Sequence, residues 1–482
     1  MSGRSCAAGR GGVKAFQPVD VAVVGGGISG LSCAFWAKRM GLSVLLLESE
    51  PSVGGCMRSV RNGECIADGG PQSIMSSPEF MELVEAAGIK ELARTPAAEA
   101  NQPYLFHGGR LVPVPQNLPA LLSSPLLSLG GKLRLLSEPL VASRRSDAGA
   151  AEQDESVAAF VRRRAGPQVL DALVSPFVSG IFAGDPDKLS MRSAFPAVVD
   201  MERRHGSVLR GAVASRRAAR RNGAVPKRRQ SVGFGGGNDR LPAALAEQLG
   251  RELRTSAPVQ AIWQRGEWLE LSLADAALSR IVARSVVLAT PAFVAADLLA
   301  RFEPAASAEL RAIAYSPVIQ IALAYPRNAI GAPLDGFGFL AARSEGLRIL
   351  GCVWNSAMFP DRCAREEDVL LTVFLGGALD PGVLAASDDE LVRAAHADLR
   401  RAMKIHDGMP RVIAGFRWAK AIPQYDVGHD RKLKTIADAV ARIPHMHLCG
   451  SYLTSPSVPD CIKLAKSVAE GLGRSLETRA KT

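Results

Sequence analysis

Three glycines near the start of the chain are spaced as in a turn that holds a pyrophosphate. Gly25, Gly27 and Gly30 form a G-x-G-x-x-G pattern directly after an apolar, β-branched run. Only glycine allows the tight turn at the first position and close approach of the main chain to a phosphate at the second, and the third lets a helix pack onto the strand. The N-terminal amides and the dipole of that helix would then point at the pyrophosphate.

The residues around this turn predict the elements that must position it. Residues 21–24 read as a strand, 31–39 as a helix, and 43–47 as a second strand that ends in Glu48. Glu48 lies 18 residues beyond Gly30, where a carboxylate accepts hydrogen bonds from a ribose 2′-hydroxyl. Strand, glycines, helix, strand and acid in this order predict a dinucleotide site. The alternative is a tight βα turn that binds nothing.

The signals typical of a Rossmann-like domain fall in three separate parts of the chain. We predict FAD-binding segments at 17–90, 233–299 and 441–482, a helical region that faces substrate or membrane at 91–232, and an α+β substrate domain at 300–440. The predicted fold class is therefore α/β, with a Rossmann-like FAD-binding domain built from three discontinuous segments, an inserted α+β substrate domain and a helical region. Such a plan indicates FAD, because nicotinamide dehydrogenases usually keep the cofactor domain contiguous.

A second glycine pair supports FAD. Gly54 and Gly55 follow Glu48 closely and give a turn at which the main chain can approach a phosphate or a flavin without interference from a Cβ atom. A pair in this place is typical of the amine-oxidase-like flavoproteins, although an isolated Gly-Gly is more often only a turn.

The composition is that of an ordinary folded protein with a basic excess. The 482 residues are 47% hydrophobic and 22% charged, with a net charge of +11. Much of the excess lies between Arg203 and Arg229, where no acid follows Glu202 until Asp239. A solvated loop is one interpretation of this basic run, and attraction to an anionic membrane or a carboxylate-rich ligand is the other. The sequence contains no recognisable nucleic-acid-binding motif and no pattern of aromatic residues for base stacking, so it does not indicate nucleic-acid binding.

The eight cysteines and seven histidines have no metal-binding spacing, so we predict no metal site, no disulfide framework and a reducing compartment. Residues 1–16 are basic but have no apolar core of a secretory signal. They read as a disordered N-terminus or the stub of an organelle-targeting peptide. We expect a bacterial cytoplasmic or peripheral-membrane location, or a plastid or mitochondrion in a eukaryote.

The longest uncharged stretch, 111–131, contains four prolines that would break a membrane-spanning helix. Its leucines suit either a core, which we favour slightly, or a membrane interface.

Several inner motifs resemble the protoporphyrinogen oxidases, the FAD enzymes of haem and chlorophyll synthesis. The resemblance runs from Val21 to the final helix and is most specific at 179–196. Shorter matches are Glu202 with His205-Gly-Ser, Asp335-Gly-Phe-Gly-Phe-Leu, Phe374-Leu-Gly-Gly, Ala421-Ile-Pro-Gln-Tyr with Gly428-His429, and Asp460-Cys-Ile. It implies oxidation of protoporphyrinogen IX to protoporphyrin IX, with O2 reoxidising the flavin, and often a homodimer.

The resemblance also implies the site residues. Those that would bind FAD are Gly25, Gly26, Gly27, Ile28, Ser29, Gly30, Glu48, Ser49, Gly54, Gly55, Gly70, Pro71, Gln72, Ser73, Val259, Pro456, Ser457 and Val458. Those that would contact the macrocycle are Gly180, Ala183, Phe337, Leu340 and Phe374. No catalytic acid or base is assigned, because hydride transfer to a flavin needs mainly orientation and exclusion of water.

Two departures from the family pattern bear on the substrate. The arginine that pairs with a substrate propionate is replaced by Pro103, which leaves Arg110 or the basic run as substitutes. Before the last helix the chain reads Ser455-Pro456-Ser457, and Pro459 precedes Asp460. Gln72 also replaces the family's common Asn. The alternatives are a diverged enzyme acting on coproporphyrinogen III or another amine-oxidase-type substrate, and a non-catalytic FAD- or porphyrin-binding protein.

Overall fold

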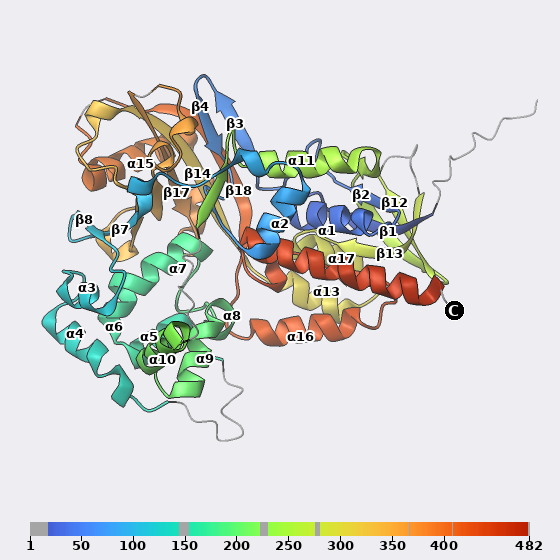
Figure 1. The fold of residues 1–482 in the computed structure, drawn as a ribbon, viewed down its shortest axis with the longest axis horizontal. Helices are drawn as coiled ribbons and strands as arrows, with labels where there is room; N and C mark the ends of the chain where they lie inside the picture. The colour runs from blue at the N-terminus through green and yellow to red at the C-terminus, as the bar shows by residue number, and fades with distance from the viewer. Residues whose placement is uncertain are drawn as a thin grey trace, which may run out of the picture.

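Two large sheets organise the protein, with a bundle of helices beside the second sheet (Figure 1). The computed structural model describes residues 18–143, 154–221, 230–274, 280–365, 367–406 and 408–480. The C-terminal helix runs along the first sheet, away from the helical bundle.

The first sheet joins strands from all three predicted cofactor segments. Its order is β10-β2-β1-β13-β12-β11, and β19 also pairs with β13. The strands are β1 (Val19–Val24), β2 (Val44–Leu47), β10 (Leu253–Arg254), β11 (Val259–Arg265), β12 (Trp268–Leu273), β13 (Arg280–Leu288) and β19 (Met446–Leu448). Because β1 is parallel to both β2 and β13, and β13 is parallel to β19, the carboxyl ends of these strands lie at one edge.

Helices cover both faces of this sheet, as the sequence of β1 requires. Its side chains alternate between two cores: Val21 and Val23 belong to one, and Ala22 and Val24 to the other. The first face carries α1 (Ile28–Arg39), α2 (Pro78–Ala86), α11 (Arg240–Leu249) and α17 (Val458–Ala480). The second face carries α12 (Ala292–Leu299), α13 (Pro304–Arg311) and α16 (His429–Val440).

The second sheet has the order β18-β14-β17-β16-β15-β7-β8. Its strands are β7 (Gln102–His107), β8 (Arg110–Pro113), β14 (Tyr315–Pro326), β15 (Gly336–Ala341), β16 (Gly351–Val353), β17 (Asp368–Gly376) and β18 (Arg411–Pro423). Helix α15 (Asp388–Met403) packs on one face through Leu391, Ala395 and Leu399. Strands β7 and β8 come from the segment expected to be helical, so that segment also contributes to the substrate sheet.

Most of the remaining helices form the bundle beneath the second sheet (Figure 1). They are α3 (Leu118–Ser123), α4 (Leu129–Leu136), α5 (Val157–Arg164), α6 (Pro167–Val169), α7 (Ser175–Phe182), α8 (Met191–Ala194), α9 (Pro196–His205) and α10 (Val208–Arg221), with the short turn η3 (Glu138–Leu140). Small elements elsewhere are β3 (Ser59–Asn62), β4 (Cys65–Asp68), β5 (Ile74–Met75), β6 (Ala93–Arg94), β9 (Ser231–Phe234) and α14 (Asn355–Met358).

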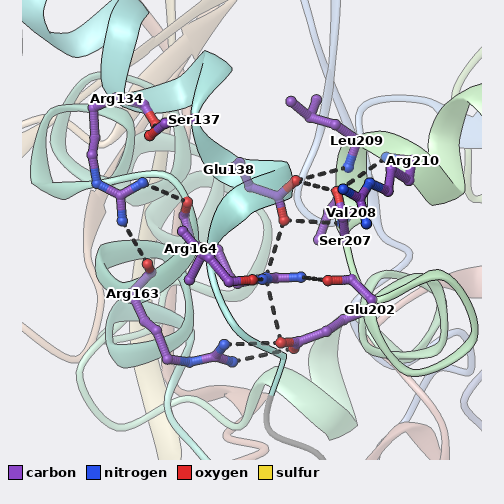
Figure 2. Close-up of polar contacts among 12 residues, drawn as sticks. Arg134, Ser137, Glu138, Arg163, Arg164, Glu202, Ser207, Val208, Leu209 and Arg210 are labelled. Atoms are coloured by element: carbon purple, nitrogen blue, oxygen red, sulfur yellow. Dashed lines mark hydrogen bonds and ion pairs between the residues drawn. The ribbon is translucent and has the colours of Figure 1, made fainter.

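A buried ion cluster fixes the helices of this bundle (Figure 2). Arg164, 1% exposed, places its Nε 3.0 Å from a Glu138 oxygen and 3.3 Å from a Glu202 oxygen. Glu138 also accepts hydrogen bonds from the Ser207 hydroxyl and from the main-chain N–H of Val208 and Leu209. A carboxylate from η3 therefore caps the N-terminus of α10, where negative charge is favourable. Glu202 and part of the His205-Gly-Ser motif therefore belong to this structural cluster.

The structure joins Cys65 and Cys363 in a disulfide, although the cysteine spacing predicts none. The two residues are 298 positions apart, and a separation of that length carries no pairing signal in sequence. Cys65 begins β4 and Cys363 lies between α14 and β17, so the bond ties the first cofactor segment to the substrate domain. Within the described ranges, none of the helices has both the length and the apolar character to cross a membrane.

Candidate cofactor and substrate site

The glycine turn between β1 and α1 has three glycines with three different surroundings. Gly25 has φ +105°, and a Cβ there would lie 2.7 Å from the Ala289 carbonyl oxygen. A Cβ at Gly30 would overlap the Gly25 carbonyl oxygen, so this glycine permits the helix to pack on the turn. Gly27 differs, because a Cβ there meets no protein atom within 4 Å. The protein alone does not require glycine at this position.

The N-terminus of α1 is suited to bind an anion. Gly27 is its N-cap residue, no side chain caps the helix, and its first turn contains no acid. The first amide groups of a helix have no intrahelical acceptor and lie at the positive end of the dipole. Open space at Gly27 in front of an uncapped helix is the arrangement that a pyrophosphate needs, so these residues fit FAD.

Glu48 lies beside this turn, at the end of β2. It is buried and accepts hydrogen bonds from the main-chain N–H of Gly26 at 2.5 Å and of Glu50 at 2.8 Å. The Ser49 hydroxyl donates at 3.1 Å to Oε1, which also accepts the Glu50 N–H, whereas the Gly26 N–H donates to Oε2. Each carboxylate oxygen has two lone pairs, so capacity for a ribose hydroxyl remains. Val259 begins β11 close by, because the Ala257 N–H donates to the Glu48 carbonyl oxygen at 2.8 Å.

The second glycine pair packs against the first turn. Gly54 has φ +104°, forms a bridge with Gly27 and donates its N–H to the Gly26 carbonyl oxygen at 2.8 Å. A Cβ at Gly55 would lie 3.4 Å from the Gly27 Cα. The structure therefore brings together Gly25 to Gly30, Glu48, Gly54 and Gly55.

The loop of Gly70, Pro71, Gln72 and Ser73 connects the cofactor domain to the second sheet. Next to it, the Gly69 carbonyl oxygen accepts a hydrogen bond from the Trp418 Nε1 at 2.7 Å. The Gln72 amide donates to the Gln320 Oε1 at 3.3 Å and accepts from the Asn355 Nδ2 at 2.6 Å.

The C-terminal residues Pro456, Ser457 and Val458 form the entry to α17, which packs on α1. The Ser455 hydroxyl donates to Asp460 Oδ2 at 2.5 Å and accepts from the Ser457 N–H at 3.1 Å. Pro459 is the second residue of α17, where no intrahelical N–H bond is lost. Serine and proline here therefore make a regular helix start.

Predicted substrate residues lie on one face of the second sheet. Leu340 on β15, Gly351 on β16, Phe374 on β17 and Gln320 on β14 are directly opposite one another in successive strand pairs. Residues opposite each other in a sheet project to the same face. This transverse row consists of a leucine, a glycine, a phenylalanine and a glutamine, and it contains no side chain that titrates.

Helix α7 lies over this row and supplies the two small residues. A Cβ at Gly180 would clash with Leu340, so glycine is needed for the helix to approach the sheet. Ala183, at the left-handed C-cap of α7, packs with Val318 and Leu350 in a cluster that Phe374 joins. The structure does not place Phe337 in the row: it is the extra residue of a β-bulge between β15 and β7 and is 40% exposed.

The substitutes expected for the arginine that Pro103 replaces are Arg110 and the basic run, and neither lies on the row. Pro103 pairs with Gly338 of β15. Arg110 pairs with His107 at the exposed end of the β7–β8 hairpin. The described arginines of the basic run lie at the end of α9 and along α10, while Lys227, Arg228 and Arg229 fall outside the described residues.

The Gln424-Tyr425 and His429 motif braces α7 against the cofactor domain. The Gln424 amide donates to the Phe182 carbonyl oxygen at 2.9 Å, and the Tyr425 hydroxyl donates to the Ser451 carbonyl oxygen at 2.7 Å. The buried His429 places Nε2 2.9 Å from the Tyr452 carbonyl oxygen, so this nitrogen carries the proton. Burial lowers the pKa of His429 below its usual 6.5.

Two polar residues at the site were missed by sequence reasoning. Gln320 interrupts an otherwise apolar strand, a signal that could have identified it. Arg343 follows β15 and gives no such signal, because a charged residue after a strand is usually solvated. Among the described residues, no group of three or more His, Cys, Asp or Glu side chains could hold a metal.

Comparison with known proteins places this geometry in a family. The profile of the flavin containing amine oxidoreductases matches residues 28–472. Protoporphyrinogen oxidase 1 of spinach chloroplasts is 33% identical, over 94% of this chain and 84% of its own length. Coproporphyrinogen III oxidase of Bacillus subtilis is 29% identical, over 93% of this chain and 96% of its own.

Solved structures agree on the fold. A crystal structure from Exiguobacterium sp. 255-15, which carries a provisional protoporphyrinogen oxidase name, superposes with a TM-score of 0.79 at 24% identity. The match covers 95% of this chain and 99% of that one.

Proposed function

The chain belongs to the flavin-containing amine oxidoreductase family, and from that premise we propose that it oxidises protoporphyrinogen IX to protoporphyrin IX with O2 as acceptor. It is an FAD-dependent oxidoreductase. When bound, FAD would accept a hydride from a saturated bridge of the macrocycle, and O2 would remove the electrons as peroxide.

The observation that carries the proposal is the row of Leu340, Gly351 and Phe374 beneath α7. Its apolar side chains suit the faces of a macrocycle, and α7 presents the small residues Gly180 and Ala183 to it, with Gly180 packed against Leu340. The row reaches the cofactor side through Gln320, which contacts Gln72. Because the row contains no titratable side chain, we propose that these residues orient the substrate and exclude water rather than exchange protons with it.

Anaerobic mixing of the FAD-loaded protein with protoporphyrinogen IX tests the function directly. We expect the flavin absorbance to bleach, then to return with porphyrin fluorescence when oxygen is admitted, faster than spontaneous oxidation. Flavin that stays oxidised would reject this function and favour either a different substrate or a non-catalytic FAD- or porphyrin-binding role.

Coproporphyrinogen III is the second candidate substrate, and the Bacillus subtilis relative favours it. The two porphyrinogens carry two and four carboxylates. A comparison of kcat/KM for them decides between the candidates, with the larger value identifying the substrate.

The cofactor site has its own test in Gly27→Val. The Cβ atom would lie in the open space in front of α1 with no protein atom within 4 Å, so we expect a folded, colourless protein. Gly415→Val is a matched control, because a Cβ at Gly415 also meets nothing within 4 Å, on exposed strand β18. Retention of yellow FAD by Gly27→Val would contradict the assignment.

We further propose that the helical bundle contacts a membrane surface. Leu126 and Leu127 are buried, as a core interpretation of 111–131 predicts, but Leu129 is 78% exposed and begins an apolar stripe along α4 and η3. The exposed members of this stripe are Leu129, Leu133, Leu136 and Leu140. A cavity of about 290 Å³ between η3 and α10 is lined by Pro139, Leu209, Arg210, Val213, Ala214 and Arg217. Apolar side chains beside arginines suit an anionic lipid surface.

Cosedimentation with anionic lipid vesicles tests this contact. Replacing Leu129, Leu133 and Leu140 together by serine should abolish cosedimentation, while serine at the exposed Leu384, Met409 and Val427 should leave it unchanged. Equal cosedimentation of both triple variants would contradict the proposal.

A further inference from the structure

Arg343 is a partly buried cation that has no carboxylate partner. Its Nη1 donates to the Arg348 carbonyl oxygen at 3.1 Å and its Nη2 to the Gly376 carbonyl oxygen at 2.6 Å. The Nε is buried and makes no hydrogen bond. Among the described residues, the guanidinium thus has main-chain carbonyl partners only, which solvate it without neutralising its charge.

The nearby carboxylates are engaged by other groups. Asp380 lies 3.3 Å from the Arg348 Nε, and Asp398 accepts the main-chain N–H of Arg348 and Ile349. Burial is the main influence on the Arg343 guanidinium and lowers its pKa, with attraction to Asp380 acting in the opposite direction. Arginine nevertheless stays charged in proteins, so the site retains a positive charge.

This charge lies at the edge of the proposed substrate row. Arg343 lines a narrow cleft that has no space for a water molecule, together with Ser179, Ala183, Gly184, Leu350, Gly376, Gly377, Ala378 and Leu379, so a ligand group enters it only when a lining side chain moves. Ala183 and Leu350 also belong to the apolar cluster that Phe374 joins. The half-exposed Leu379 is the lining side chain with most freedom to turn and admit a ligand group.

We propose that Arg343 binds a carboxylate side arm of the substrate and so replaces the cation that Pro103 cannot provide. This inference rests on the proposed porphyrinogen site and adds the group that recognises the propionate. A guanidinium offers a planar fork that matches the two oxygens of a carboxylate, and the unused Nε–H is one of its donors. Arg343 is a specificity residue in this role, because the reacting bridge carbon contacts the apolar row.

The test compares Arg343→Met with Arg343→Lys on a substrate with carboxylates and on one without. With protoporphyrinogen IX, we expect Arg343→Met to raise KM at least about tenfold with kcat little changed, because a charge-assisted contact of about 1.5 kcal/mol or more is lost. Arg343→Lys should give an intermediate KM. With the dimethyl ester of the same porphyrinogen, KM should be the same in wild type and Arg343→Met.

Arg401→Met is the matched control. Arg401 also donates to main-chain carbonyl oxygens nearby, of Gly346 at 2.9 Å and Glu345 at 3.4 Å, but is exposed. It should leave KM unchanged for both substrates. Thermal midpoints and FAD content establish that each variant is folded.

A KM that rises equally for the acid and the ester would overturn the proposal and make Arg343 a structural residue. If wild type oxidises neither compound, the proposed function fails separately. In that case the carboxylate-binding role of Arg343 is tested by titrating the protein with protoporphyrin IX and with its dimethyl ester, and binding is measured by porphyrin fluorescence. Weaker binding of the acid alone in Arg343→Met supports the carboxylate site, and equal binding to wild type and variant rejects it.

Discussion

The fully buried Arg164 and the partly buried Arg343 show two ways in which this protein holds an arginine away from solvent. Both donate to main-chain carbonyl oxygens, Arg164 to those of Val141 and Gly206. Only Arg164 also meets carboxylates, from Glu138 and Glu202, and its cluster ties together α5, α9, η3 and α10. A buried charge that is neutralised within the protein maintains structure, whereas one left without a counter-charge beside a cleft is available to a ligand.

The largest effect should come from Arg164→Met. Removal of this cation leaves Glu138 and Glu202 facing each other without it, and loss of one partner of a buried pair costs about 3–5 kcal/mol. Denaturant unfolding should show the loss in a protein whose KM is unchanged. The neighbouring Arg162, which pairs with Asp187 at the surface, is the control, and Arg162→Met should not shift the midpoint. A stable Arg164→Met protein with a raised KM would reverse the comparison.

Glu138→Gln should have a smaller effect in the same cluster. Arg164 keeps Glu202, and the amide oxygen can still accept one N–H of α10, so the free energy of unfolding should fall by about 1.5–3 kcal/mol. Hydrogen exchange should increase most in the first turn of α10, because Val208 and Leu209 donate to Glu138. Unchanged exchange there would mean that another group caps the helix.

Leu379→Asp should make Arg343 resemble Arg164. The new carboxylate enters the cleft from its exposed rim and should compete with the substrate carboxylate, raising KM about tenfold, or about 1.4 kcal/mol. The unfolding free energy should stay close to that of wild type, because Leu379 is half exposed. Leu379→Asn is the uncharged control and should retain the wild-type KM.

The smallest effect concerns His429, a buried group that remains neutral. Its pKa is lowered in the folded protein, so it contributes stability that is present above 6.5 and is lost as the pH falls through the folded pKa. Between about pH 7.5 and about pH 5.5, the free energy of unfolding should therefore decrease more in wild type than in His429→Gln. Identical pH dependence of the two proteins would show that protonation of His429 does not oppose folding.

The glycines of the cofactor turn and the two arginines differ in how far the sequence predicts their roles. Gly25 and Gly30 could be predicted from their local turn, because each of these two glycines satisfies a steric constraint within a few residues or across one strand pair. The meeting of β1, β13 and β19 in one sheet was predicted from apolar strand patterns together with the three-part plan typical of FAD enzymes. Arg164 and Arg343, by contrast, are both arginines near the end of a short element, and their difference depends on carboxylates supplied from distant positions.

For the same reason, only part of the substrate row could be predicted from the sequence. Leu340 and Phe374 were identified by resemblance, but their alignment through Gly351 depends on the register of three strands. Phe337 was expected beside them, and a β-bulge sets it apart. Bulges and register shifts depend on the neighbouring strand, so a single strand's sequence does not reveal them.

The three-part construction of the first sheet also sets an order of events during synthesis. At roughly 5–20 residues per second, β13 leaves the ribosome on the order of ten to fifty seconds after β1. The apolar face of α1 then waits for α17, whose Ile462, Ala465 and Ala469 complete the same core. A nascent chain therefore exposes this surface to chaperones until its last turns are made. FAD capture becomes one of the final steps of maturation, and a premature stop near the C-terminus would leave a long polypeptide with an incomplete cofactor domain.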